Sequence, residues 1–69
     1  MNLLDVVVLK QSLPEHKLQL GAIGTVVEEL NAGIFWVEFA DKNGVAYAII
    51  DLSEQMLMKV VHEPMVSPA

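Results

Sequence analysis

The stretch GAIGTVVEEL, residues 21–30, places two glycines three positions apart, directly before a run of β-branched residues. A phosphate-binding glycine loop requires a helix after it, whose first amide groups face the anion. β-Branched residues favour a strand instead. We therefore expect a turn at Gly21 and a bulge or close backbone crossing at Gly24. Within the strand, Ile23 and Val26 are expected to face the core.

Period-two alternation of Val, Ile, Leu and Phe extends outward from this stretch and predicts five strands. Their expected ranges are 3–10, 22–30, 34–40, 45–51 and 56–61. The connections are a long polar loop at 11–21, tight turns at 31–33 and 41–44, and one helical turn at 53–55. Asp51 or Ser53 is expected to cap that helical turn. This order predicts an all-β fold, a small five-stranded SH3-like barrel with one short helical turn before the last strand.

An OB-fold is the second choice for the same elements, because it requires more residues and a longer helix between its third and fourth strands. The 69 residues form one domain, which we expect to consist of the barrel at 1–61 and a C-terminal tail at 62–69 with two prolines. Cysteine is absent from the chain, so neither a disulfide nor a thiolate metal site stabilises the domain.

The hairpin at 34–51 predicts which side chains are buried, if Ala40 lies opposite Val45. The expected pairs are Phe39 with Ala46, Val37 with Ala48, Phe35 with Ile50, Glu38 with Tyr47, and Trp36 with Ile49. The first three pairs are apolar and are expected to face the core, and the last two to face solvent. Asp5 and Lys59 set the expected facing of the outer strands by the same alternation. If both charged residues face solvent, the residues expected to face the core are Leu4, Val6, Val8, Met58 and Val60. Those expected to face solvent are Leu3, Val7, Leu9, Leu57 and Val61.

The composition favours a protein partner. Hydrophobic residues make up 54% of the chain, and so small a domain has limited interior volume for them. Four lysines oppose nine acidic residues, arginine is absent, and the net charge is −5. This charge repels phosphate backbones, so nucleic acid is not the expected partner. The apolar runs are far shorter than the ~20 residues that span a bilayer. Without a recognisable signal peptide, the cytoplasm is the expected location.

The polar residues do not form an evident chemical site. The chain has two histidines, His16 and His62. Each has one adjacent glutamate, but neighbouring side chains on an extended chain point in opposite directions, so neither pair is a natural metal chelate. Ser12 and Ser53 lie in a loop and at a cap, and the adjacent Glu28 and Glu29 alternate between faces. We therefore expect no catalytic, metal-binding or cofactor-binding residues, and no enzymatic activity.

The candidate partner-binding site is an exposed aromatic row on the outer face of the central hairpin. Its predicted members are Ile34, Trp36, Glu38, Tyr47 and Ile49. Aromatic anchors surrounded by acidic residues are typical of protein interfaces. Alternatively, Leu13, Leu18 and Leu20 of the long loop cover this row. A groove for proline-rich peptides is a weaker interpretation, because aromatic residues make up only 6% of the chain.

The segment LGAIGTVV, residues 20–27, resembles a KOW-type motif of SH3-like barrels in transcription and ribosomal proteins. The whole chain resembles a family of short bacterial proteins classified only as a domain of unknown function, in four segments: LLDVVVL, LPEHKLQLGAIGTVVE, VEFADKNG and YAIIDLS. The resemblance implies an SH3-like barrel with no established activity, encoded as a small companion of another gene in the manner of toxin–antitoxin or immunity pairs. Basic residues usually surround the glycines of RNA-binding KOW modules, whereas Glu28 and Glu29 follow them here.

Two functions are therefore predicted. The first is a small non-enzymatic protein-binding module, an antitoxin- or immunity-like companion of a basic partner protein, or a homo-oligomer. The second is a KOW-type accessory protein that binds nucleic acid.

Overall fold

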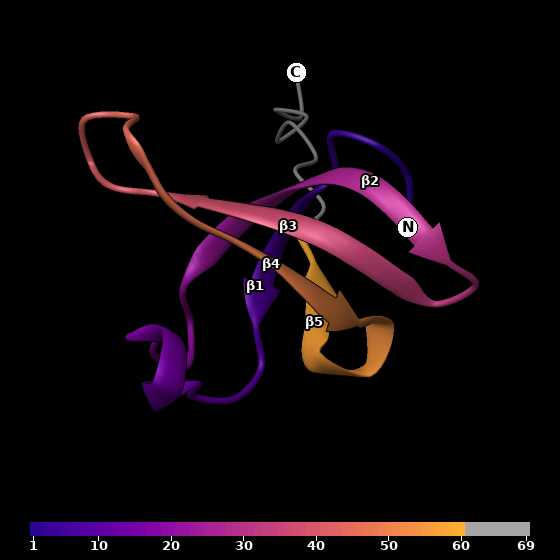
Figure 1. Ribbon diagram of the computed structural model, residues 1–69, viewed down its shortest axis with the longest axis horizontal. Coiled ribbons are helices and arrows are strands. Elements are labelled where there is room, and N and C mark those ends of the chain that lie inside the picture. The colour runs from indigo at the N-terminus through magenta and orange to yellow at the C-terminus, as the bar shows by residue number, and fades with distance from the viewer. Residues whose placement is uncertain (61–69) are drawn as a thin grey trace, which may run out of the picture.

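The computed structural model describes residues 1–60, which form one five-stranded antiparallel sheet (Figure 1). The strands are β1 (Val6–Leu9), β2 (Ile23–Asn31), β3 (Ile34–Ala40), β4 (Ala46–Ser53) and β5 (Leu57–Lys59). Two single 3-10 turns, η1 (Pro14–His16) and η2 (Glu54–Met56), complete the elements. The predicted all-β class, the number of strands and the helical turn before the last strand are confirmed. The predicted tail at 62–69 lies outside the described residues.

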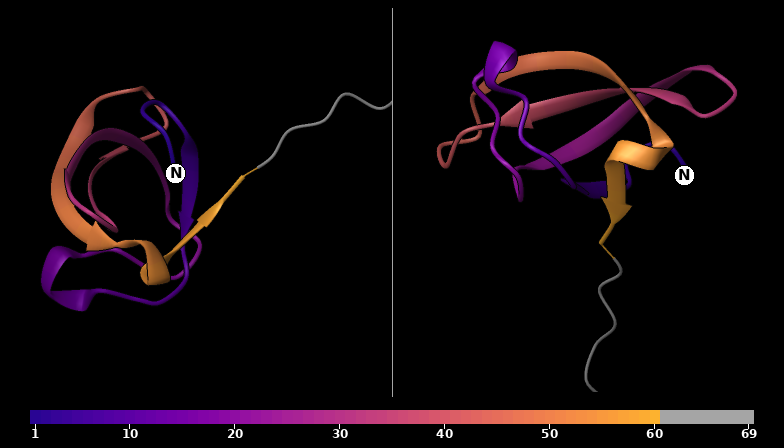
Figure 2. Two further views of the ribbon diagram at one scale, coloured as in Figure 1. Left: turned by 90° about the vertical axis from the view of Figure 1, so that its right-hand side faces the viewer. Right: turned by 90° about the horizontal axis from the view of Figure 1, so that it is seen from below.

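The strand order across the sheet is β4-β3-β2-β1-β5. The sheet curls around a common axis into a barrel-like shape, which the left view of Figure 2 shows. Strongly twisted sheets of this size close around their own apolar face because that face needs cover from water. The first and last strands, β1 and β5, pair directly with each other, although most of the chain separates them in sequence.

The inner face of the sheet forms a single apolar core. Its buried members are Val7, Leu9, Leu13, Leu18, Val26, Phe35, Val37, Phe39, Leu52 and Leu57. The prediction for β3 is confirmed, because all three of its inward residues are at most 2% exposed. The long loop differs from its prediction. It contains η1, and its leucines 13 and 18 pair with each other and enter the core rather than covering the outer face of the hairpin.

Gly24 lies where β2 passes close to β3. A β-carbon built on Gly24 would lie 2.5 Å from Cγ1 of Val37 and 3.0 Å from a ring carbon of Phe39. Both atoms belong to side chains, and Gly24 pairs regularly with Phe39, so side-chain packing limits the space there and the expected bulge or backbone crossing is not found. The register shifts of β2 occur later, between Val26 and Asn31. Gly21 has a φ of +92°, which agrees with the expected turn.

Two residues of GAIGTVVEEL were predicted to face the core. The prediction is right for Val26, which is fully buried, and wrong for Ile23, which is 63% exposed. The two residues are an odd number of positions apart, and β2 remains regular between them. Side chains in a regular strand alternate between faces, so one of the two had to point outward. Gly24, whose neighbours on β3 leave no room for a side chain, occupies the inward position beside Ile23.

The facing predicted for β1 is wrong. Val7 and Leu9 are fully buried, whereas Val6 is 42% exposed. The prediction counted from Asp5, but that residue lies before the strand, in a turn where Leu4 has a φ of +68°. Asp5 shares the inner side with Val7 and Leu9, but it lies at the rim, where its carboxylate pairs with Lys59. Its charge therefore does not mark the outward face of the strand.

The facing predicted for β5 is wrong for the same kind of reason. Leu57 is buried and Met58 is 56% exposed, whereas the alternation from Lys59 predicted the reverse. Lys59 does point to the inner side, but at the rim, where its Nζ lies 3.5 Å from Oδ2 of Asp5. A long side chain with a partner at the rim keeps its charge in water while its stem lies against the core. Val61 lies outside the described residues.

The β3–β4 pairing is shifted by two residues from the prediction. Phe39 lies opposite Ala48, Glu38 opposite Ile49, and Trp36 opposite Asp51. The pairing is irregular between Phe39 and Ala40, where β4 contains one extra residue on the side of the turn. Because the shift is an even number, residues 48–51 keep their predicted face while their cross-strand neighbours change. Ala46, which was predicted to face the core, lies beyond the irregularity opposite Ala40 and is exposed. Ser53 precedes η2 at the cap position, but its side chain makes no capping hydrogen bond.

Asp5 provides a prediction for the pH dependence of stability. The backbone amide of Asn2 donates a 2.8 Å hydrogen bond to its Oδ2, and this bond, with the nearby Lys59 ammonium, lowers the pKa of the carboxyl below 3.8. The unfolded chain therefore takes up the proton first as the pH falls, and the stabilisation is lost as the pH passes through the lowered folded pKa. Urea denaturation of wild type and Asp5→Asn should differ most at neutral pH and converge in acid. A constant difference across the pH range would contradict this.

Candidate protein-binding site

Trp36 lies on the outer face of β3 between two carboxylates on neighbouring strands. Glu28 on β2 and Asp51 on β4 are its direct cross-strand partners. The indole is 42% exposed, so one part of the ring packs on the sheet and the other contacts solvent. Directly opposed residues in a sheet have β-carbons about 5 Å apart, which places both acidic side chains beside the ring.

Glu38 and Ile49 extend this surface along the hairpin. Glu38 follows Trp36 on the same face of β3 and lies directly opposite Ile49 of β4, which is 52% exposed. The Trp36 surface, as we call it, therefore consists of one indole, one isoleucine and three carboxylates: Trp36, Ile49, Glu28, Glu38 and Asp51. Asp51 was not predicted as a member because the expected register placed Ile49 opposite the indole, and no register was predicted for the strand that contains Glu28.

The three carboxylates of the Trp36 surface have no cationic partner within residues 1–60. The one ion pair formed there joins Asp5 to Lys59, at the other end of the sheet order. Carboxylates grouped on one face raise the local negative potential, which attracts a cation. A guanidinium or ammonium group above the indole face would also gain from the ring's quadrupole.

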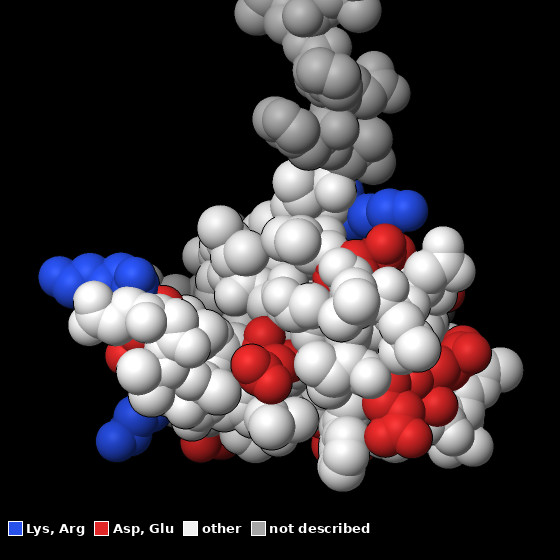
Figure 3. Space-filling model, turned by 90° about the horizontal axis from the view of Figure 1, so that it is seen from above, with Lys and Arg blue, Asp and Glu red and all other residues white. Residues whose placement is uncertain are grey.

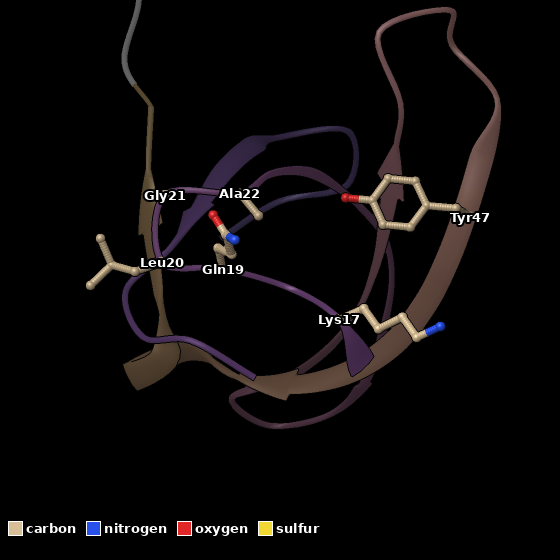
Figure 4. Close-up of a pocket in the computed structure, with 6 residues that line it drawn as sticks. All are labelled: Lys17, Gln19, Leu20, Gly21, Ala22 and Tyr47. Carbon is tan, nitrogen blue, oxygen red and sulfur yellow. The ribbon is translucent and has the colours of Figure 1, made fainter. Parts of the chain in front are cut away.

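Tyr47 and Ile34, the other two predicted members, lie at the margins of this surface. Ile34 is half-buried opposite Ser53, at the β2–β3 end of the hairpin. Tyr47 lies where the β3–β4 pairing becomes irregular, and it lines an open hollow of about 400 Å³ with Lys17 and residues 19–22. Figure 4 shows its ring extending across the opening toward Ala22, while Leu20 points away. The structure therefore brings together Trp36, Glu38 and Ile49 of the predicted row.

Charge is distributed unevenly along the molecule. The loops at 10–22 and 41–45 lie at the same end of the antiparallel strands. Together they contain the lysines at 10, 17 and 42 and two acidic residues, Glu15 and Asp41. The remaining described residues contain one lysine and six acidic side chains. Figure 3 shows blue surface at the hairpin end on the left and the largest red area at the right. The Trp36 surface belongs to the acidic part.

The other polar residues considered above are structural or solvent-exposed where the structure describes them. The Ser12 hydroxyl accepts a 3.0 Å hydrogen bond from the amide of Leu20 and thereby fixes the long loop. His16 is exposed in η1, and His62 lies outside the described residues. Within 1–60, histidine and acidic side chains form no group of three or more that could hold a metal ion. None of the helical turns in this part has the length and apolarity needed to cross a membrane.

Comparison with known proteins identifies the family but no characterised relative. Neither a curated protein nor a solved structure matches the chain significantly. Residues 3–59 match the model of the family described as Domain of unknown function (DUF4926). This match includes all five strands and every residue of the Trp36 surface. The protein belongs to the DUF4926 family of domains of unknown function.

Proposed function

We propose that the protein is a non-enzymatic, SH3-like protein-binding module that binds a basic partner protein through the Trp36 surface. An antitoxin- or immunity-like role, in which this small acidic chain neutralises a basic protein in the cytoplasm, agrees with that activity. The observation that supports the proposal is the half-exposed indole bracketed by Glu28 and Asp51, with Glu38 beside them. An aromatic anchor among carboxylates that lack internal partners matches the chemistry of an arginine- or lysine-rich surface.

Trp36 itself reports on this binding, because it is the only tryptophan in the chain. We expect an arginine-rich peptide to change the intrinsic fluorescence of the protein in a saturable titration. The apparent affinity should fall as salt is added, because exposed charges are screened. A charge-matched peptide containing glutamate in place of arginine should leave the fluorescence unchanged.

Glu38→Gln and Asp51→Asn are expected to weaken peptide binding by about threefold to tenfold each, which corresponds to the loss of one partly exposed charge interaction. Glu15→Gln is the matched control, since it removes the same charge from the exposed turn η1, outside the Trp36 surface. Equal weakening by all three substitutions would indicate attraction by net charge alone and contradict a defined site. Absence of binding to any basic peptide or protein would refute the proposal.

A KOW-type nucleic-acid-binding accessory is the second candidate. It is supported by the three lysines at the loop end and by the hollow that Lys17 and Tyr47 line there, where a base can stack on the ring beside a cation. The charged residues that carry the two candidates differ, carboxylates for the first and lysines for the second. Retardation of single-stranded RNA at low salt that is lost with Lys17→Gln, but unaffected by Glu38→Gln, would favour the second candidate over the first.

A further inference from the structure

The proposed function leaves open how a basic protein chain would lie on the Trp36 surface. We propose that an extended segment of the partner, alternating basic and apolar residues, adds to the edge of β4 as a sixth strand. The inference rests on the proposed function and specifies its mode of binding. It starts from β4, which is the last strand at one side of the sheet.

The second edge of β4 has no backbone partner among residues 1–60. Seven of its eight residues pair with β3, the exception being Tyr47 at the irregularity, and none pairs with another described strand. The backbone hydrogen bonds formed outside the strands do not include any donor or acceptor from 46–53. An edge of this length, without proline or lysine, is a template for another strand. Exposed edges in stable proteins are usually blunted, so an edge that is not blunted is a candidate for pairing.

The opposite edge of the sheet shows that contrast within the same molecule. β5 has three residues, and its Lys59 points to the inner side and pairs with Asp5. Short length and an inward-pointing charge are two devices that prevent edge-to-edge association. β4 has neither device, since its inward residues after Ala46 are Ala48, Ile50 and Leu52.

The hydrogen-bond pattern identifies which amides of β4 face outward. The amide of Glu54 donates to the carbonyl of Gly33 at 2.8 Å, so this pair occupies a hydrogen-bonded position of the ladder. Hydrogen-bonded positions recur at alternate pairs along an antiparallel ladder. Leu52, Ile50 and Ala48 therefore bond to β3. The backbone groups of Ile49 and Asp51 point to the open edge.

The inner side of β4 is incompletely covered. Ala48 and Ile50 are half-buried, whereas their partners Phe39 and Val37 on β3 are completely buried. The hollow beside Tyr47 leaves further space at the start of the strand. Apolar side chains of an added strand would cover this inner side, and every second residue of that strand would point to the outer face.

Charge selects the basic partner over a second copy of this chain. Outward residues of an added strand would lie beside Asp51 and one strand away from Trp36 and Glu38. Basic side chains at these positions meet carboxylates that lack internal partners. A second copy would bring another acidic hairpin, from a chain of net charge −5, to the same edge.

The test compares a ten-residue peptide of alternating arginine and valine with the same peptide N-methylated at alternate residues, which cannot pair along one edge. We expect the unmodified peptide to bind about tenfold more tightly, because several backbone hydrogen bonds depend on it. Amide hydrogen exchange should show new protection at Ile49 and Asp51 in its complex. Equal affinity of the two peptides without this protection overturns the inference but leaves the proposed function intact. Binding of neither peptide overturns both.

A pair of variants separates the backbone of β4 from its side chains. Ile49→Pro and Ile49→Ala both remove the isoleucine, but only proline removes the outward amide, and it leaves the bonds to β3 in place. We expect Ile49→Pro to abolish the tenfold preference for the unmodified peptide, while Ile49→Ala retains it. Protection of Ile49 that appears without peptide and rises with protein concentration would identify a second copy as the occupant and overturn the inference.

Discussion

Replacing Phe39 with alanine is expected to lower the free energy of unfolding by about 3–5 kcal/mol. The ring is completely buried, and its cross-strand neighbours are the small residues Gly24 and Ala48. The phenylalanine fills the space that these two residues leave, so its removal creates a cavity that neither neighbour can fill. Small domains have total stabilities near the lower end of 5–15 kcal/mol, so this one substitution should leave the domain barely folded at room temperature.

Tyr47→Ala is the matched control for Phe39→Ala. It removes an aromatic ring of similar size from the adjacent strand, but the ring is 54% exposed. We expect a loss of less than about 1 kcal/mol, because little apolar surface leaves water when Tyr47 folds against the sheet. Urea denaturation followed by circular dichroism measures both variants. Similar losses for the two substitutions would contradict the assignment of the inner and outer faces of the hairpin.

The central hairpin shows what the sequence predicts well. Phe35, Val37 and Phe39 alternate with Trp36 and Glu38 in a segment with no turn residue, so the facing follows from local alternation alone. Its bounds, Ile34–Ala40, agree with the prediction. The neighbouring strand was predicted with the right faces from Ala48 onward, the wrong face for Ala46 and the wrong register. Register depends on the length of the turn and its irregularity, which the residues 41–44 do not specify.

The outer strands show where counting from a charged residue fails. Asp5 and Lys59 each predicted solvent on their own side, yet both are on the inner side at the rim, where they pair with each other. This pairing depends on β1 and β5 being neighbours, a contact between the two ends of the described chain. Local patterns do not contain that contact. The positive φ of Leu4, unusual for a bulky residue, likewise has no signal in the sequence.

The candidate site was half predictable. Trp36, Glu38 and Ile49 follow from alternation, because being on the outer face depends only on parity. Glu28 and Asp51 depend on register, and a two-residue shift changed the neighbours of the indole from Ile49 to Asp51. One signal was present for Asp51, which has the outward parity on its strand, so any even shift in the pairing of β3 with β4 kept it on that face. Glu28 has the parity of the buried Val26, and only the register shift between these two residues brings it opposite Trp36.

Gly24→Ala is expected to destabilise the protein by about 1–3 kcal/mol, the usual cost of extra volume in a packed core. The new β-carbon would lie 2.5 Å from Cγ1 of Val37, so the Val37 side chain or the backbone of one of the two strands has to shift. Gly21→Ala provides the contrast, since no atom lies within 4 Å of its β-carbon and its φ of +92° makes backbone strain the only cost.

A double-mutant cycle distinguishes steric overlap at Gly24 from a general loss of backbone freedom. Val37→Ala alone is destabilising, because it removes buried methyl groups. In the presence of Gly24→Ala, the same substitution also removes the atom that the new β-carbon meets at 2.5 Å. The double variant should therefore be more stable than the sum of the two single losses predicts, by about 1 kcal/mol or more. Additive losses in urea denaturation would show that Gly24 is required for its conformation rather than for the close approach of the two strands. Coupling would establish that the second glycine of GAIGTVVEEL serves strand packing, since contact with a bound phosphate would not connect its substitution to Val37.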